Sequence, residues 1–145
     1  MENIQVKVKD IVLRPVNEVF DSILNPKKLS KFFISRASGP IKKGQNIIWF
    51  FDDVGGELSV SIKEVILNTC ISFEWAASGR IATVKIKLDS IDSNKTSILI
   101  TEENFPLDNN GVKQALGQTQ GWTDFICCMK AFLYCGINLR EGRNK

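Results

Sequence analysis

Five strand-like segments, separated by short turn-forming stretches, constrain the fold of this chain more than any other feature. Apolar and polar residues alternate in four of them, and the fifth, residues 47–51, is apolar throughout. In each segment every second residue is apolar, which is the pattern of a strand with one buried face. Stretches rich in Asn, Asp, Ser, Thr and Gly separate them at residues 52–56, 68–69, 78–79 and 92–94. Strands joined by such short turns pair in antiparallel fashion. Together with an earlier alternating segment, Ile4 to Lys9, they predict an antiparallel sheet of about six strands.

Two short helices are predicted between the first two strands. Pro15 is suited to a first helical turn, and Val16, Val19 and Ile23 follow it at helical spacing. Asn25-Pro26 ends that helix. A second short helix is expected to carry Leu29, Phe32 and Phe33.

One long helix is predicted after the last strand. Asp108 to Asn110 supply N-cap candidates, and Gly136 is a C-cap candidate. Apolar residues recur at three-, four- and six-residue steps over about 25 residues, at Val112, Leu116, Trp122, Ile126, Met129 and Leu133. Only this helix is long enough to cover the apolar face of the sheet. We therefore predict a single α+β domain, residues 1–145, with the sheet curved around the C-terminal helix and the basic tail after Arg140 frayed.

The composition narrows the chemistry that the chain can perform. It contains no histidine, which excludes His-based acid–base catalysis, His-activated nucleophiles and His-ligated metals. Its four cysteines include no Cys-x-x-Cys pair, so we expect no metal site and no cofactor.

Charge and hydropathy argue against nucleic acid and membrane as partners. The net charge is only +3, and the basic residues are spread along the chain instead of clustered. The longest apolar runs, 47–51 and 125–129, are far too short to span a bilayer. The first residues lack the layout of a signal peptide. We therefore expect a cytoplasmic protein.

Several stretches together resemble a known family. They are residues 14–21, 25–29, 32–33, 39–44, 72–75, 101–106, 121–125 and 136–139. Over nearly its whole length the chain resembles the activator of heat-shock protein 90 ATPase homologue family, a branch of the START/Bet v 1-like (SRPBCC) superfamily. The resemblance implies the helix-grip fold, which agrees with the predicted sheet and helix. It also implies either a container for small apolar molecules or a module that assists a chaperone.

Aromatic residues of the inner sheet face and the long helix are candidates to line an apolar cavity. The candidate ligand-binding residues are Trp49, Phe51, Trp75, Trp122, Phe125 and Met129, with Phe32 and Phe33 near the expected mouth. Trp75 and Trp122 stand out, because a buried indole N–H needs a partner and can orient a ligand. The alternative is that these side chains simply fill the core at ordinary density.

Glu102 is the candidate polar residue of this cavity. It continues the inward parity of Ile98 and Ile100. We expect the strand to end before Glu102, so that its side chain meets water. In the alternative it points inward, where a carboxylate needs a partner, and it then recognises a polar ligand group or acts as a lone acid or base.

Ile48 and Phe50 are candidates for a partner or dimer surface. If Ile47, Trp49 and Phe51 face inward, the two residues between them face outward on an expected edge strand. Exposed apolar residues beside a strand edge favour association with another chain. The alternative is that a loop covers them.

Three functions follow in order of preference. The first is non-enzymatic binding of a small apolar or amphipathic molecule between sheet and helix. The second is a protein-interaction or chaperone-associated module, with a homodimer as one form. The third is a cyclase- or hydrolase-like enzyme that uses Glu102, although no second carboxylate for paired acid–base chemistry is evident.

Overall fold

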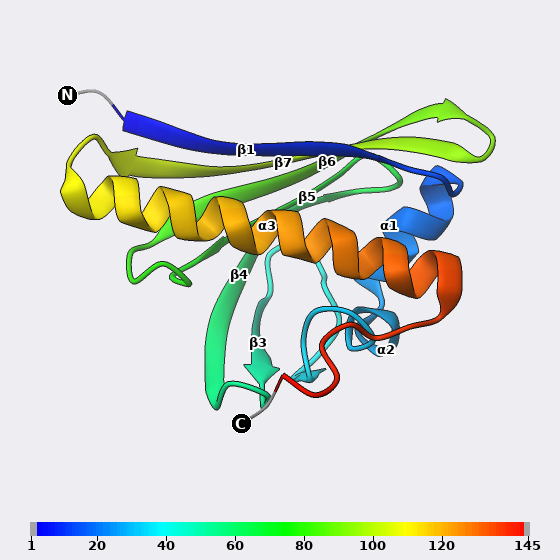
Figure 1. Ribbon diagram of the computed structural model, residues 1–145, viewed down its shortest axis with the longest axis horizontal. Coiled ribbons are helices and arrows are strands. Elements are labelled where there is room, and N and C mark those ends of the chain that lie inside the picture. Colours follow the sequence, from blue (N-terminus) through cyan, green and yellow to red (C-terminus); the bar gives the residue numbers. More distant parts are fainter. Residues whose placement is uncertain (1–2, 144–145) are drawn as a thin grey trace.

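The alternating segments form the strands of one antiparallel sheet in the computed structural model, which describes residues 3–143. Spatial order in the sheet is β1-β7-β6-β5-β4-β3-β2. The strands are β1 (Asn3–Val12), β2 (Arg36–Ala37), β3 (Asn46–Phe51), β4 (Gly56–Ile66), β5 (Cys70–Trp75), β6 (Ala82–Asp92) and β7 (Lys95–Pro106). The helices are α1 (Val16–Leu24), α2 (Pro26–Leu29) and α3 (Asn109–Cys135). The predicted α+β class and helix-grip architecture are confirmed (Figure 1).

The sheet has seven strands, where about six were predicted. The additional strand, β2, pairs Arg36 with Phe50 and Ala37 with Trp49. A two-residue strand has no alternation that a sequence pattern can reveal. Because β2 lies outside β3, the expectation that residues 46–51 form the edge strand is wrong.

The two short helices lie between β1 and β2, as predicted, but α2 is shorter than expected. Asn25 caps it by accepting a hydrogen bond from the Lys27 N–H at 3.0 Å. After Leu29 the N–H groups of Lys31 and Phe32 bond to carbonyls only three residues back. Hydrogen bonds over three residues belong to 3₁₀ turns and not to an α-helix. Phe32 and the residue after it therefore lie in turns beyond α2, and the prediction that the helix carries them is wrong.

The long helix begins and ends where the caps predicted. Asp108 accepts a hydrogen bond from the Gly111 N–H at 2.7 Å, and Gly136 closes α3 in the left-handed conformation. A Cβ on Gly111 would lie 1.8 Å from the carbonyl oxygen of Pro106, so only glycine fits there. This close approach joins the end of β7 to the start of α3.

The buried stripe of α3 differs from the prediction in its first turns. Trp122, Ile126 and Met129 are buried as expected, but Val112 and Leu116 are 38% and 67% exposed. A six-residue step turns a helix by about 600°. Leu116 and Trp122 therefore face different sides, and the buried stripe passes through Ala115 instead.

Helix α3 crosses the concave face of the sheet obliquely (Figure 1). Its backbone lies nearest to β1 and β7, and α1 packs against β6 and β7. The strands β3 and β4 curve away below it in this view. Large side chains are needed to fill the wider space between α3 and β3–β5. Within residues 3–143, no helix combines the length and apolarity needed to cross a bilayer.

Candidate functional site

A cluster of aromatic rings occupies the wide end of the space between α3 and the sheet. Phe33, in the turns after α2, lies at its centre. The ring centroid of Phe33 is 4.9–6.4 Å from those of Trp49, Phe51, Trp75, Trp122 and Phe125. Most of these pairs meet edge to face, which is the favourable arrangement for aromatic rings. The cluster therefore joins β3, β5 and α3 through one half-buried side chain.

A cavity of about 280 Å³ adjoins this cluster. Five of the predicted ligand-binding residues line it: Phe33, Phe51, Trp75, Trp122 and Phe125. Its polar lining comes from Gln118, Asp124 and Arg140. The tertiary structure thus brings residues of β3, β5, α3 and the C-terminal segment to one hollow.

The other predicted residues lie outside the lining. Trp49, Phe32 and Met129 are 2%, 0% and 0% exposed, and they pack in the core beside the cavity. Phe32 stacks against Phe132 and meets the lining residue Phe125 edge to face, but Phe32 itself is not part of the lining. These three side chains hold the walls in place, while a role in ligand binding stays a prediction.

Glu102 is fully buried directly behind the cavity lining. The indole N–H of Trp75 donates to its Oε2 at 3.0 Å, and the indole N–H of Trp122 donates to its Oε1 at 2.8 Å. The Gln118 side-chain amide donates to both oxygens, at 2.9 and 3.2 Å. The expectation that the strand ends before Glu102 and exposes it to water is wrong. Strand β7 continues to Pro106, and three N–H donors replace water around the carboxylate.

The sequence pattern did not single out the polar lining residues Gln118, Asp124 and Arg140. Of these, Gln118 has the clearest signal in the sequence. It lies one helical turn before Trp122 on α3 and so presents its amide to the same side. That four-residue spacing was the available signal. It became meaningful only once Glu102 was known to point inward.

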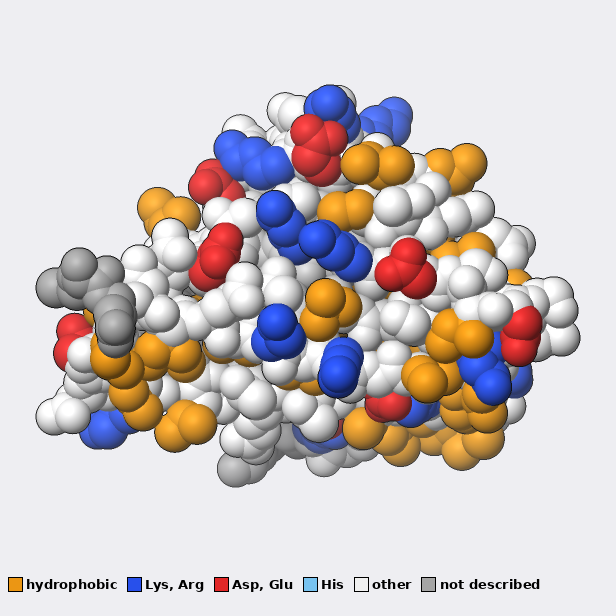
Figure 2. All heavy atoms as spheres, turned by 90° about the horizontal axis from the view of Figure 1, so that it is seen from above, with side chains coloured by type: hydrophobic (Ala, Val, Ile, Leu, Met, Phe, Trp, Pro, Cys, Tyr) orange, Lys and Arg blue, Asp and Glu red, His pale blue; other side chains and the backbone are white. Residues whose placement is uncertain are grey.

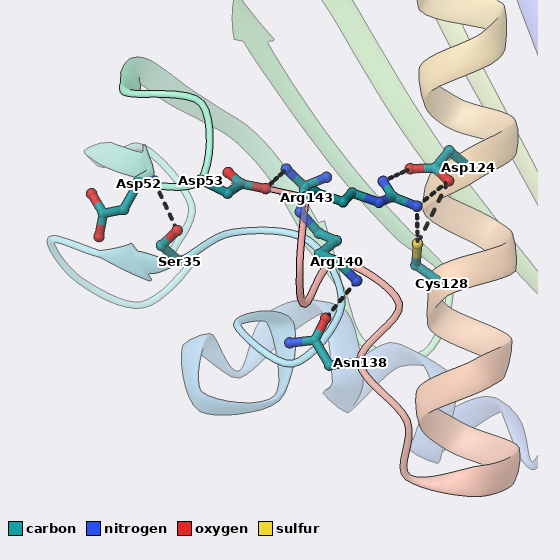
Figure 3. A network of polar contacts seen from close by, with 8 residues as sticks. All are labelled: Ser35, Asp52, Asp53, Asp124, Cys128, Asn138, Arg140 and Arg143. Atoms are coloured by element: carbon teal, nitrogen blue, oxygen red, sulfur yellow. Dashed lines mark hydrogen bonds and ion pairs between the residues drawn. The ribbon is translucent and has the colours of Figure 1, made fainter. Parts of the chain in front are cut away.

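The segment that follows α3 runs between α3 and the β3–β4 turn (Figure 3). Arg140 of this segment lines the cavity, and we call this side of the cavity its mouth. Arg140 pairs with Asp53 of the β3–β4 turn at 2.5 Å, and Arg143 pairs with Asp124 of α3 at 2.8 Å. The expectation that the tail frays after Arg140 is therefore wrong for residues 141–143, because Asp53 holds Arg140 and Asp124 holds Arg143. Residues 144–145 lie outside the described part of the chain.

The ion pair at the mouth alters the titration of its neighbours. The hydrogen bond from the Arg143 guanidinium lowers the pKa of Asp124, although partial burial opposes this. Burial raises the pKa of the Cys128 thiol, and the adjacent Asp124 carboxylate raises it further. Cys128 is therefore a packed thiol beside the pair, not an activated nucleophile.

Ile48 and Phe50 face outward, as predicted, but they are only half exposed. The guanidinium carbon of Arg36, in β2, lies 3.9 Å from the centroid of the Phe50 ring. Ser38 bonds to both the N–H and the carbonyl oxygen of Ile48. The segment at residues 36–38 thus covers part of this edge, as in the alternative of a covering loop, and leaves Ile48 and Phe50 half exposed.

The outer face of the sheet is mixed in character. Figure 2 shows basic side chains interspersed with acidic and apolar ones over this face. The exposed side chains include Lys7, Lys9, Lys63, Lys85 and Lys87.

Within residues 3–143, no group of three or more Cys, Asp or Glu side chains is arranged to hold a metal ion.

Known structures share this fold over almost the whole chain. SSP2350 from Staphylococcus saprophyticus is 29% identical, with a TM-score of 0.83 over 94% of this chain and 96% of its own. The Aha1 dimer from Colwellia psychrerythraea is 17% identical, with a TM-score of 0.78 over 92% and 98% of the two chains. DynU16, a putative protein of the dynemicin biosynthetic locus, is 21% identical with a TM-score of 0.81. The match covers 92% of this chain but only 48% of DynU16.

No curated protein matches the sequence. A family model matches residues 14–133, which include the strands β2 to β7, the helices α1 and α2 and most of α3. That model describes activator of Hsp90 ATPase homolog 1-like proteins. The match contains both indoles and the carboxylate of the candidate site. The chain therefore belongs to the activator of Hsp90 ATPase homolog 1-like family.

Proposed function

We propose that the protein binds a small apolar or amphipathic molecule in the cavity between α3 and β3–β5. The observation that carries this proposal is the aromatic lining of a hollow of about 280 Å³. Small-molecule pockets are mostly apolar with a few polar groups, and their usual volumes begin at roughly 300 Å³. The size therefore favours a compact ligand over a long acyl chain.

Apolar burial alone supplies useful affinity at such a site. A ligand that buries about 200 Å² of apolar surface gains about 5 kcal/mol at roughly 25 cal/mol per Å². Part of this gain is offset by the loss of translational and rotational freedom. Rigid aromatic walls limit the further cost of ordering side chains. No covalent chemistry is required for binding of this kind.

Native mass spectrometry of the purified protein, repeated under denaturing conditions, is the first test. A retained ligand appears as a mass excess that disappears on denaturation. Binding is then measured with tert-butylbenzene, a compact neutral probe, through the NMR signals of the three indole N–H groups. Those of Trp75 and Trp122 should shift, while that of Trp49, outside the lining, serves as reference.

Phe33 and Phe32 form a matched pair of neighbours for this test. Phe33 lines the cavity and is half-buried, whereas Phe32 is fully buried outside the lining. Phe33→Ala should weaken tert-butylbenzene binding about tenfold, because one wall is lost. Phe32→Ala should lower the free energy of unfolding more and leave the affinity nearly unchanged. Equal affinities for wild type and Phe33→Ala would argue against the cavity as the binding site.

A chaperone-associated or dimeric module is the second candidate. Membership of the family supports it, as does the shared fold with the Aha1 dimer from Colwellia psychrerythraea. Ile48 and Phe50 remain the proposed contact residues. Phe50→Lys should then shift the molar mass measured by light scattering from dimer to monomer. A wild-type protein that is monomeric at all concentrations would count against the homodimer.

A further inference from the structure

The carboxyl group of Glu102 is buried among hydrogen-bond donors and has no cationic partner. It is 0% exposed, and its three hydrogen-bond donors are the neutral side chains of Trp75, Trp122 and Gln118. An ionised carboxylate only accepts hydrogen bonds, and all of these partners donate. Among the described residues, no ion pair within 4.0 Å includes Glu102.

The other charges at the cavity are already paired. Asp53 binds Arg140, and Asp124 binds Arg143. Asp124 and Arg140 line the cavity, and each has a partner of opposite charge. Of these four side chains and Glu102, only Glu102 lacks such a partner. In a buried, low-dielectric site such a charge acts on neighbouring groups more strongly than it would in water.

Two indole rings lie between that charge and the cavity. The rings of Trp75 and Trp122 stack at a centroid distance of 5.4 Å with 29° between their planes, and both line the hollow. A hydrogen bond from an indole N–H to an anion polarises the ring and makes its faces more negative. Negative aromatic faces attract cations, and Trp does so best among the aromatic residues. The negative charge of Glu102 thus makes the electrostatic potential at the cavity more negative by polarising both rings.

We propose that the cavity selects compact aromatic or apolar molecules that carry a positive charge, such as amines or quaternary ammonium compounds. This inference rests on the proposed binding function and specifies its ligand class. The cationic group lies against the parts of the Trp75 and Trp122 rings that line the cavity, and the apolar part contacts Phe33 and Phe125. Arg140 does not oppose such a ligand, because Asp53 neutralises it at the mouth.

Three probes of nearly equal shape and size separate charge from volume. They are phenyltrimethylammonium (cation), tert-butylbenzene (neutral) and benzenesulfonate (anion). The dissociation constants are measured on wild type from the indole N–H shifts of Trp75 and Trp122. We expect the cation to bind about tenfold more tightly than the neutral probe and the anion to bind most weakly. Neutral or anionic binding as tight as that of the cation would overturn the inference and leave the proposed function standing. Absence of binding by all three probes would overturn both.

Variants test whether Glu102 is the source of the preference. Glu102→Gln removes the charge and should reduce the tenfold preference to about twofold. Glu103→Gln is the matched control, because its carboxylate lies on the opposite face of β7 and bonds to Gln5. It should leave the preference unchanged. Trp75→Phe retains an aromatic wall without the N–H and provides a second route if Glu102→Gln does not fold. It should weaken binding of the cation more than binding of the neutral probe. An equal loss of affinity for both probes would contradict the role of the polarised indole.

Discussion

The two ends of the space between α3 and the sheet are built differently. Near α1, aliphatic side chains of β6, β7 and α3 pack with almost no exposure, among them Ile86, Ile98 and Ile126. Toward β3–β5 the same helix stands farther from the sheet, and aromatic rings, a carboxylate and a cavity occupy the space. Ile126 and Trp122 mark the two environments only one helical turn apart.

The difference shows how one helix serves both stability and a site. Close-packed aliphatic residues contribute hydrophobic free energy in proportion to the apolar area that they bury, and they leave no room for a ligand. Rigid rings that meet edge to face hold two walls apart and preserve a hollow. We therefore expect substitutions at the aliphatic end to change stability, and those at the aromatic end to change binding as well.

Ile126→Ala is expected to have the largest effect on stability. Ile126 is 1% exposed at the aliphatic end, and truncation there should lower the free energy of unfolding by about 2–5 kcal/mol. Urea denaturation measures this loss. Leu116→Ala is the control on the same helix, since Leu116 is 67% exposed and should cost about 0.5 kcal/mol or less. A loss below about 1 kcal/mol for Ile126→Ala would mean that the aliphatic end is loosely packed.

Gly117→Ala and Gly121→Ala should each stabilise the protein by about 0.5–1 kcal/mol. Both lie inside α3, where glycine is a poor helix former, and a Cβ at either position meets no atom within 4 Å. Thermal unfolding measures the gain. Only Gly121 lines the cavity, so only its variant should also change tert-butylbenzene affinity. A loss of stability in either variant would show that the space beside α3 is occupied in solution.

Asp124→Asn should have the smallest effect, and that effect should depend on pH. The pKa of Asp124 is lower in the folded state than its ordinary value of 3.8 because Arg143 binds the carboxylate. The pair therefore stabilises the fold above about pH 4, and this contribution disappears as the pH falls through the lowered pKa. The side chains of Asp124 and Arg143 are about 40% exposed. The free energy of unfolding of wild type should therefore exceed that of the variant by less than about 1 kcal/mol at neutral pH. Denaturation curves at pH 7 and at pH 2.5 test this. A difference that persists at the lower pH would assign the effect to packing instead of charge.

Local patterns were sufficient for most of the fold. Alternation placed strands such as β5 and β6, which pair in one regular register, and the caps Asp108 and Gly136 placed both ends of α3. They failed where no period exists, as in the two-residue strand at Arg36, and where steps of six residues were grouped with steps of three and four. The alternation along β7 did not decide whether Glu102 points inward or meets water, because its burial depends on partners elsewhere in the chain.

Those partners explain the limit of the sequence pattern. Trp75, Trp122 and Gln118 lie 27, 20 and 16 residues from Glu102, on β5 and α3. A carboxylate is buried only when such donors replace its water. The alternation of residues within one strand does not show which donors other elements will supply. The class of fold follows from periodicity, since periodicity decides which face of each element avoids water. The cavity, the buried charge and the ion pairs at the mouth follow only from how distant elements pack together.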